Sequence, residues 1–250
     1  MGDVLERDVG WVGERCDELA RRQHWLSTLA LSRLPDGSLE ARYSFRHALY
    51  RQVLYQRIGA LARAQLHRRA ALSMERSRTA GVAVTAAELA SHFELSHDLV
   101  AALRYYAEAA NAALRSFAPT EALGLTAHAL ELLPCCPETG ERLELELALV
   151  APRCSAASQL LGVASPEATA AFERAQILSE LVPAKTSRAM ELSGLGWVFH
   201  VRGEYEKSRA LASRIHLLAG SRSDPRLGVS ASNLMGATLA HQGELPAARQ

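Results

Sequence analysis

The stretch GWVFHVRGEYEKSR, residues 196–209, is followed further along the chain by GATLAHQGELPAAR, residues 236–249. In both stretches a glycine precedes a large apolar residue by three positions, a Gly-Glu pair and an apolar residue follow, and a small residue and Arg come last. Such self-similarity is typical of stacked helical hairpins, because each repeat unit buries its apolar face only against its neighbours. The sequence therefore predicts a helical-repeat scaffold.

A common register can be assigned to these two units. In the first of them, the inward positions of the leading helix are Leu192, Leu195, Gly196 and Phe199, the turn is Gly203, and the second helix opens with Tyr205 and Ser208. In the next unit the same positions hold Ser232, Met235, Gly236, Leu239, Gly243, Leu245 and Ala248. Two more divergent units upstream place Ala122 and Ala168 where Ser208 stands. Because they lack a Cβ, Gly196 and Gly236 are expected to let a neighbouring helix approach closely.

The composition favours a helical protein with reduced thiols. A chain of 250 residues with 48% hydrophobic content can fill a core, and its abundant Ala and Leu favour helices. A net charge of +1 gives no strong case for a nucleic-acid partner, since such proteins usually carry a strongly basic face. The four cysteines form no C-x-x-C pair. The N-terminus lacks the basic region of a signal peptide, and no run of about 18 apolar residues occurs. We therefore expect a cytoplasmic protein that neither enters nor crosses a membrane.

The N-terminal part changes from helical to strand periodicity. Residues 10–23 have apolar side chains at helical spacing, whereas apolar and polar residues alternate along residues 39–45. The Pro-Asp-Gly at residues 35–37 supplies a turn, and the leucines of residues 29–34 supply a preceding strand. A helix followed by a β-hairpin is the ending of a winged-helix unit.

From His47 onward the pattern predicts helices alone. Three helix starts are marked by capping residues, namely Thr85 with Glu88, Ser165 with Pro166 and Asp224 with Pro225. We expect a mainly α fold, a tetratricopeptide-like (TPR-like) α-solenoid preceded by a small winged-helix remnant with one β-hairpin. The expected division is a remnant over residues 1–58, a connecting helix over 59–83 and helical repeats over 84–250, the last repeat incomplete. Since a solenoid end usually carries a polar capping helix, we expect the natural polypeptide to continue.

The chain carries no catalytic motif that we can name. It has no G-x-x-x-x-G-K-[ST] loop and no G-x-G-x-x-G, so it lacks a recognisable way to hold a nucleotide phosphate. Gly-x-Ser-x-Gly and His-Glu-x-x-His are also missing. We therefore predict no catalytic, cofactor-binding or metal-binding residues and a chain that is not itself an enzyme.

Two smaller clusters have competing interpretations. His92 and His97 are five residues apart and point to different sides of a helix, so helix-end positions are favoured over a metal site, which needs three or four convergent ligands. The adjacent Cys135 and Cys136 are interpreted as a structural loop between two repeats rather than a redox pair.

A set of arginines has two interpretations, a DNA footprint on a winged helix or a surface that faces solvent or another domain, and the second is favoured. Its members are Arg42, Arg46, Arg51, Arg57, Arg63, Arg68 and Arg69.

The concave face of the predicted solenoid is the best candidate for a binding surface. By repeat register it contains Ser193, Trp197, His200, Val201, Asn233, Ala237, Ala240 and His241. Trp197 is the expected anchor for a bound protein or peptide, because aromatic side chains in partly exposed grooves often anchor ligands. The alternative for Trp197 is a core position between two units.

The order of these parts resembles a known family. Residues 13–58, with GERCDELARRQHWL, the PDG turn and YSFRHALYRQVLYQRI, resemble the winged-helix end of STAND-type signalling ATPases. Residues 84–250, with AAELASHFE, ALRYYAEAANAALRSFAPTEALGLTAHALELL, SPEATAAFERAQIL and LGWVFHVRGEYEKSRALA, are similar to the tetratricopeptide region that follows in those proteins. In bacterial regulators such ATPases are joined to a LuxR-type DNA-binding domain or an adenylate/guanylate cyclase domain.

The resemblance implies a switch in which an upstream ATPase module holds ATP, the winged helix packs on that module, and the repeats act as sensor and docking arm. The partners implied are a peptide or protein in the repeat groove and an ATPase domain in cis or in trans. The chain lacks the ATPase core and any effector domain, so ATP binding is not carried over to its residues. Two alternatives stay open: the central fragment of an ATPase or cyclase enzyme, and a regulator that binds DNA through the winged helix.

Overall fold

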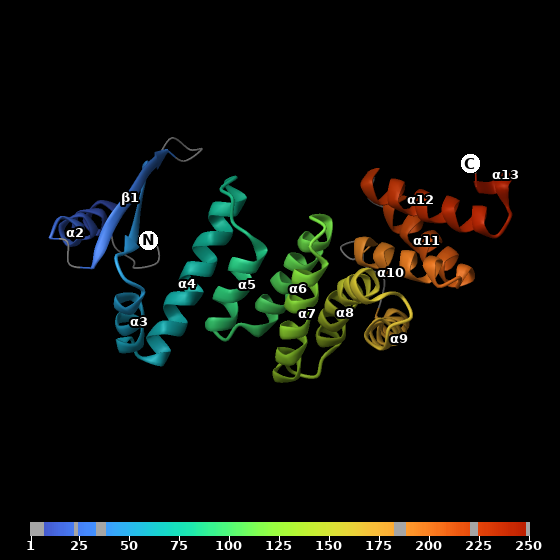
Figure 1. Cartoon of the computed structure of the whole chain (residues 1–250), viewed down its shortest axis with the longest axis horizontal. Coiled ribbons are helices and arrows are strands. Elements are labelled where there is room, and N and C mark those ends of the chain that lie inside the picture. Colours follow the sequence, from blue (N-terminus) through green and yellow to red (C-terminus); the bar gives the residue numbers. More distant parts are fainter. Residues whose placement is uncertain (1–7, 23–24, 34–38, 183–188, 221–224, 249–250) are drawn as a thin grey trace. The chain divides into compact units, whose positions relative to one another are not determined.

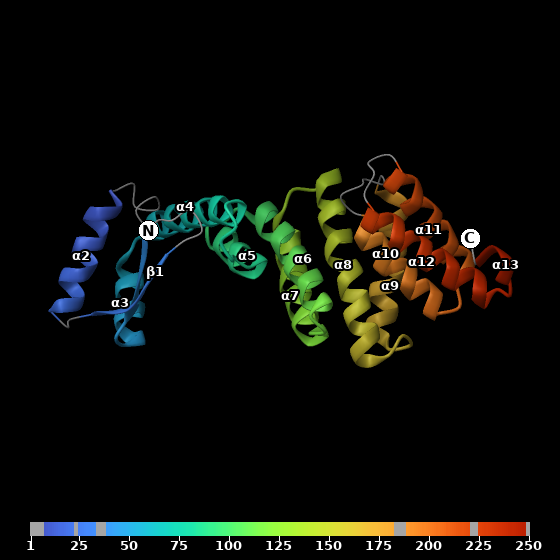
Figure 2. The ribbon, with the colours of Figure 1, turned by 90° about the horizontal axis from the view of Figure 1, so that it is seen from above.

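The protein is mainly helical and has one small antiparallel sheet among the residues described (Figures 1 and 2). The computed structural model describes residues 8–22, 25–33, 39–182, 189–220 and 225–248. The chain divides into two compact units, Met1–Ala102 and Leu103–Gln250. The boundary expected at residue 83 thus lies inside the first unit, and each unit is described by itself.

The first unit begins with a helix and a β-hairpin. Its elements are α2 (Val9–Arg21), β1 (Leu26–Arg33), β2 (Leu39–Phe45), α3 (Ala48–Arg57), α4 (Ala60–Thr79) and α5 (Ala86–Leu95). The strands pair antiparallel, with Leu26 opposite Phe45, and a bulge falls between Thr28 and Ala30. The predicted N-terminal helix and hairpin are therefore confirmed, whereas the predicted turn at residues 35–37 lies outside the described residues.

Tyr43 of β2 fixes α2 against the hairpin. Its hydroxyl donates a hydrogen bond to a carboxylate oxygen of Asp17 at 2.7 Å and lies 3.5 Å from the carbonyl oxygen of Gly13. The bond to Asp17 favours the neutral phenol and raises the pKa of Tyr43 to about 12. A single side chain thus connects the sheet to two successive turns of α2.

Local capping explains where α3 and α5 begin. The imidazole of His47 accepts a hydrogen bond from the amide of Leu49 at 3.1 Å. Thr85 and Glu88 form the predicted capping box, in which each side chain accepts from the other residue's amide. The helix that follows, α5, packs along α4, and α4 is joined to α3 through Gly59.

The second unit is a succession of helices. Its elements are α6 (Leu99–Arg115, which spans the division), α7 (Pro119–Leu132), the 3-10 turn η1 (Leu133–Cys135), α8 (Gly140–Leu161), α9 (Pro166–Leu181), α10 (Ala189–Val201), α11 (Tyr205–Gly220), α12 (Pro225–His241) and α13 (Leu245–Ala248). Ser165 caps α9 ahead of Pro166, as predicted, whereas the predicted cap Asp224 lies outside the described residues. Helix α8 packs on α7, α9 and α10, and α12 packs on α10, α11 and α13.

Several helices end with one and the same turn. A residue in the left-handed conformation follows the last turn, and the amide after it donates to the carbonyl five residues back, which satisfies an otherwise unpaired helix-end carbonyl. These residues are Gly81, His97, Phe117, Gly203 and Gly243, with φ of 87°, 62°, 56°, 77° and 84°. The turns predicted at Gly203 and Gly243 are therefore confirmed.

The close approach expected at the two repeat glycines is also present. A Cβ built on Gly196 of α10 would overlap the buried side chain of Leu234 in α12. One built on Gly236 would lie 3.3 Å from the carbonyl oxygen of Ala248. Ser208, the small residue of α11, is fully buried and lies 2.9 Å, hydroxyl to hydroxyl, from Thr238.

The inward positions assigned to the leading helices are borne out for one unit and partly wrong for the next. Leu192, Leu195 and Phe199 of α10 are buried, as predicted. In α12, Leu239 is buried, but Ser232 is exposed and Met235 only half-buried.

Substitution of Gly196 by leucine should destabilise the protein by about 1 to 3 kcal/mol, because the new side chain overlaps Leu234 in a close-packed contact. Gly124 is the matched control, since it is an exposed helical glycine of α7 whose Cβ would meet nothing within 4 Å. Gly124→Leu should stabilise by up to about 1 kcal/mol through helix propensity. Urea unfolding of both variants measures the difference, and equal midpoints would contradict the packing described.

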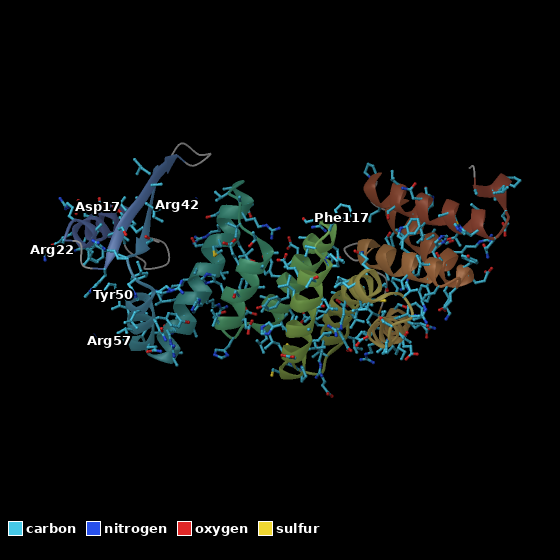
Figure 3. The ribbon with its side chains drawn as sticks, viewed as in Figure 1. Asp17, Arg22, Arg42, Tyr50, Arg57 and Phe117 are labelled. Carbon is cyan, nitrogen blue, oxygen red and sulfur yellow. The ribbon has the colours of Figure 1, made fainter. Side chains whose placement is uncertain are left out.

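Replacement of Phe117 by glycine should stabilise the protein by about 0.5 to 1 kcal/mol. The left-handed conformation costs a residue with a Cβ about 1 to 2 kcal/mol, and glycine removes this cost. Part of the stabilisation is lost because glycine raises the conformational entropy of the unfolded chain. The side chain has little packing to lose, since it is 90% exposed at the end of the α6–α7 hairpin (Figure 3). The reverse control, Gly203→Ala, should lower the thermal midpoint, and a lower midpoint for Phe117→Gly would disprove the assignment of strain.

Candidate functional site

A groove of about 910 Å³ lies within the second unit, along α6, α8 and α10. These are the leading helices of three successive pairs. The lining residues are Arg104, Ala107, Glu108, Asn111, Leu114, Arg115, Glu141, Glu144, Leu145, Ala148, Ser155, Ser158, Gln159, Val163, Gly194, Trp197, Val198 and Val201. A volume of this size is within the range of sites that hold small molecules or peptide segments.

The α6 wall of the groove is polar. Arg104, Glu108, Asn111 and Arg115 follow one another at intervals of three or four residues, which places them on one stripe of the helix. The amide of Asn111 donates to the carbonyl oxygen of Ala107 at 2.9 Å, which holds this side chain against its own helix. The small residues on the opposite face of α6 are buried and belong to the core.

The α10 wall is apolar. Trp197 is 37% exposed and Val201 is 61% exposed, whereas Val198 between them is buried. On the same wall, a Cβ on Gly194 would lie 3.5 Å from the hydroxyl of Ser155, so α8 and α10 approach closely here. The groove therefore offers a half-exposed indole beside an aliphatic side chain, a combination that suits an apolar ligand group.

The α8 residues connect the two walls. Glu141 forms an ion pair with Arg104 of α6, and both side chains are partly exposed. At the other end of α8, Ser155 donates to the carbonyl oxygen of Ala151 at 3.4 Å. The carboxylates of the groove thus lie toward the beginnings of α6 and α8, whereas Arg115 lies where α6 ends and neutral polar groups lie where α8 ends.

The side chain of Arg202 makes contacts at one edge of the groove. Arg202, which follows α10, donates to the carbonyl oxygen of the lining residue Val163 at 3.0 Å. It also lies 4.3 Å from the ring centroid of Phe172 and 3.4 Å from a carboxylate oxygen of Glu204. Arg202 therefore connects the groove edge to the turn between α10 and α11.

The predicted concave-face residues are divided by the structure. Trp197 and Val201 line the groove. Ser193 does not, because it is 4% exposed and its hydroxyl lies 2.6 Å from that of Ser230 between α10 and α12. The others also lie outside the groove lining: His200 is half-buried and Ala237 partly so, while Asn233, Ala240 and His241 are exposed on α12.

His200 and His241 belong to an aromatic cluster beside the groove. The ring of His200 packs edge-on against Trp197, Tyr205 and His241, with centroid distances of 5.4, 5.7 and 4.7 Å. Its Nδ1 lies 3.3 Å from the hydroxyl of Thr238. Burial, and secondarily the charge of His241, lower the pKa of His200 below its usual range.

Sequence analysis missed the α6 and α8 parts of the groove. The signal present was the polar stripe of α6, in which Glu108, Asn111 and Arg115 stand among alanines and leucines at helical spacing. It was overlooked because the repeat register was read from the two units with turn glycines, whereas Phe117 occupies that position after α6.

The histidines and cysteines considered as metal or redox residues lie at helix ends and in turns. His92 lies Nδ1 to Nδ1 3.0 Å from His67, and His97 occupies a left-handed turn position. Cys135 is exposed at the end of η1 and Cys136 is buried after it. Within the described ranges, no three His, Cys, Asp or Glu side chains converge as metal ligands would.

The arginine set is mostly on the surface of the first unit: Arg42, Arg46, Arg51, Arg57 and Arg68 are exposed, and Arg63 and Arg69 are half-buried. The guanidinium of Arg63 lies 5.1 Å from the ring centroid of Tyr55. Among the helices described, none has the length and the apolar sequence that crossing a bilayer requires.

Comparison with known proteins gave no match, either among family models or among curated proteins.

The stability of the second unit should fall as the pH drops from about 7.5 to 5.5, in part through His200. Because its folded pKa is below the unfolded value, the unfolded state binds the proton more readily, so its contribution is present above the unfolded pKa and lost as the pH falls through the folded pKa. His200→Asn should reduce this loss in thermal melts at the two pH values. His216→Asn, on an exposed face of α11, is the control and should melt with the wild-type pH dependence.

Proposed function

We propose that this chain is a non-catalytic signalling and protein-interaction module, the sensor and docking arm of a STAND-type ATPase regulator. In this proposal the second unit is a TPR-like solenoid and the first is a winged-helix remnant. The observation that carries the proposal is the groove along α6, α8 and α10, in which the half-exposed Trp197 lies opposite a polar helix stripe. Partner binding, rather than chemistry, accounts best for such a surface.

The repeated turn geometry supports a TPR-like assignment for the second unit. Gly203 and Gly243 adopt the same left-handed conformation, and the amides of Glu204 and Glu244 donate to carbonyls five residues back at 2.9 Å in both cases. Leading helices also pack on leading helices, α8 on α10 and α10 on α12. This pattern brings one face of each leading helix to a shared surface, as expected of a superhelical groove.

The first unit supports the second part of the proposal, a docking contact with an ATPase domain. Leu29 and Leu31 of β1 are exposed, as are Leu49, Tyr50 and Val53 of α3. Helix α3 has no buried residue within this unit. Exposed apolar side chains that recur along one helix or strand are typical of surfaces that other domains cover.

The physical role that follows is a coupling of two binding events. A ligand in the groove changes the arm only to the extent that it binds one arrangement of the helices more tightly than another. An ATPase domain bound to the hairpin and α3 would then sense which arrangement of the helices the ligand stabilises.

The proposal predicts that an ATPase accompanies this chain in its source cells. An antibody raised against residues 103–250 should isolate either a polypeptide much larger than 27.1 kDa that hydrolyses ATP, or this chain together with a separate ATPase. Hydrolysis in the isolate should be lost when the ATPase phosphate loop is inactivated.

A matched pair of variants sharpens the result for an ATPase bound in trans. Leu49→Ser combined with Val53→Ser should release it, while Trp197→Ala should leave it bound, since Trp197 lies in the groove. Isolation of the 27.1 kDa chain with no ATP hydrolysis would contradict the assignment to a STAND regulator.

A further inference from the structure

The groove has unlike ends, and from them we infer the chemical class of its occupant: an extended peptide segment with a basic side chain at one end and a large apolar side chain about six residues away. This inference rests on the proposed function of the groove as an interaction site. It adds the charge of the segment and the spacing of its two anchors along an extended backbone.

The end of the groove where α6 and α8 begin is acidic. Three carboxylates, those of Glu108, Glu141 and Glu144, line it together with the guanidinium of Arg104. Arg104 is paired with Glu141, and among the residues that line this end the carboxylates outnumber the one guanidinium. The net charge of these lining side chains is negative, so a Lys or Arg side chain of a ligand would be attracted to this end.

The opposite end is apolar and bears a positive charge. Trp197, Val201 and Val163 provide apolar surface, and Asn111 with Gln159 provides neutral hydrogen-bonding groups. The charged group at this end is Arg115, the last residue of α6 and exposed. Arg115 would repel a basic side chain placed here, so the two ends together fix the direction in which a basic and apolar segment lies.

The length of the groove sets the spacing between the two anchors. Along α8, Glu144 and Ser158 are separated by about 20 Å at the helical rise of 1.5 Å per residue. An extended peptide rises about 3.3 Å per residue, so about six residues connect the acidic end to the level of Trp197.

The test uses the whole chain and a library of short acetylated and amidated peptides, randomised at every position with cysteine left out. We expect retained peptides to be enriched at least about fivefold in Lys or Arg at one position and in Trp, Phe or Leu about six positions away. In the variant Glu108→Gln with Glu144→Gln, the basic enrichment should disappear and the apolar enrichment should stay. Trp197→Ala should remove the apolar enrichment.

A matched control has the same change of charge outside the groove. Glu173 and Glu180 are exposed on α9, and Glu173→Gln with Glu180→Gln should select the same peptides as the wild-type chain. Circular dichroism of every variant checks that the helices are intact before selection.

The outcomes separate this inference from the function on which it rests. Selection of acidic or uncharged peptides, or a basic enrichment that survives the Glu108 and Glu144 substitutions, would overturn the inference and leave the groove as a binding site. Retention of no peptide beyond the level of the Trp197→Ala variant would overturn both.

Discussion

The approach of α12 to α10 depends on the hydrogen atom that Gly196 has in place of a side chain. Leu234 fills the space that a Cβ would need, and it is itself fully buried. Interiors are close-packed, so a methyl group added at this position requires the Leu234 side chain or one of the two helices to shift. The contacts of Ser193 with Ser230 and of His200 with Thr238 require the same separation of the two helices.

The groove is a consequence of the same kind of packing between leading helices. When α8 packs against α10, and Glu141 of α8 pairs with Arg104 of α6, one face of each helix is left on a shared surface. The exposed residues on that surface, such as Trp197 and Val201, lie outside the buried core. They are therefore free to carry the charges and the indole ring that would recognise a partner, which is the usual division between scaffold and site.

Sequence patterns predicted the features that depend on neighbouring residues, and were less successful where distant helices decide the outcome. The cap at Thr85, the turn at Gly203 and the burial of Leu195 follow from local chemistry and helical period, and all are present. The burial of Ser193 could not be predicted, because it depends on a hydroxyl partner that another helix supplies. The α6 wall of the groove was missed for a related reason: Phe117 replaces the glycine that marks the repeat, although the backbone turn is the same.

Arg202 links the edge of the groove to the turn between α10 and α11. Its guanidinium donates a hydrogen bond to the Val163 carbonyl, pairs with the Glu204 carboxylate and packs on the ring of Phe172. A displacement of the α10–α11 turn is thus transmitted to the groove edge through one rigid, planar group. One side chain therefore joins the loop before α9 to the turn after α10, so the groove edge and that turn cannot move apart without breaking the Arg202 contacts.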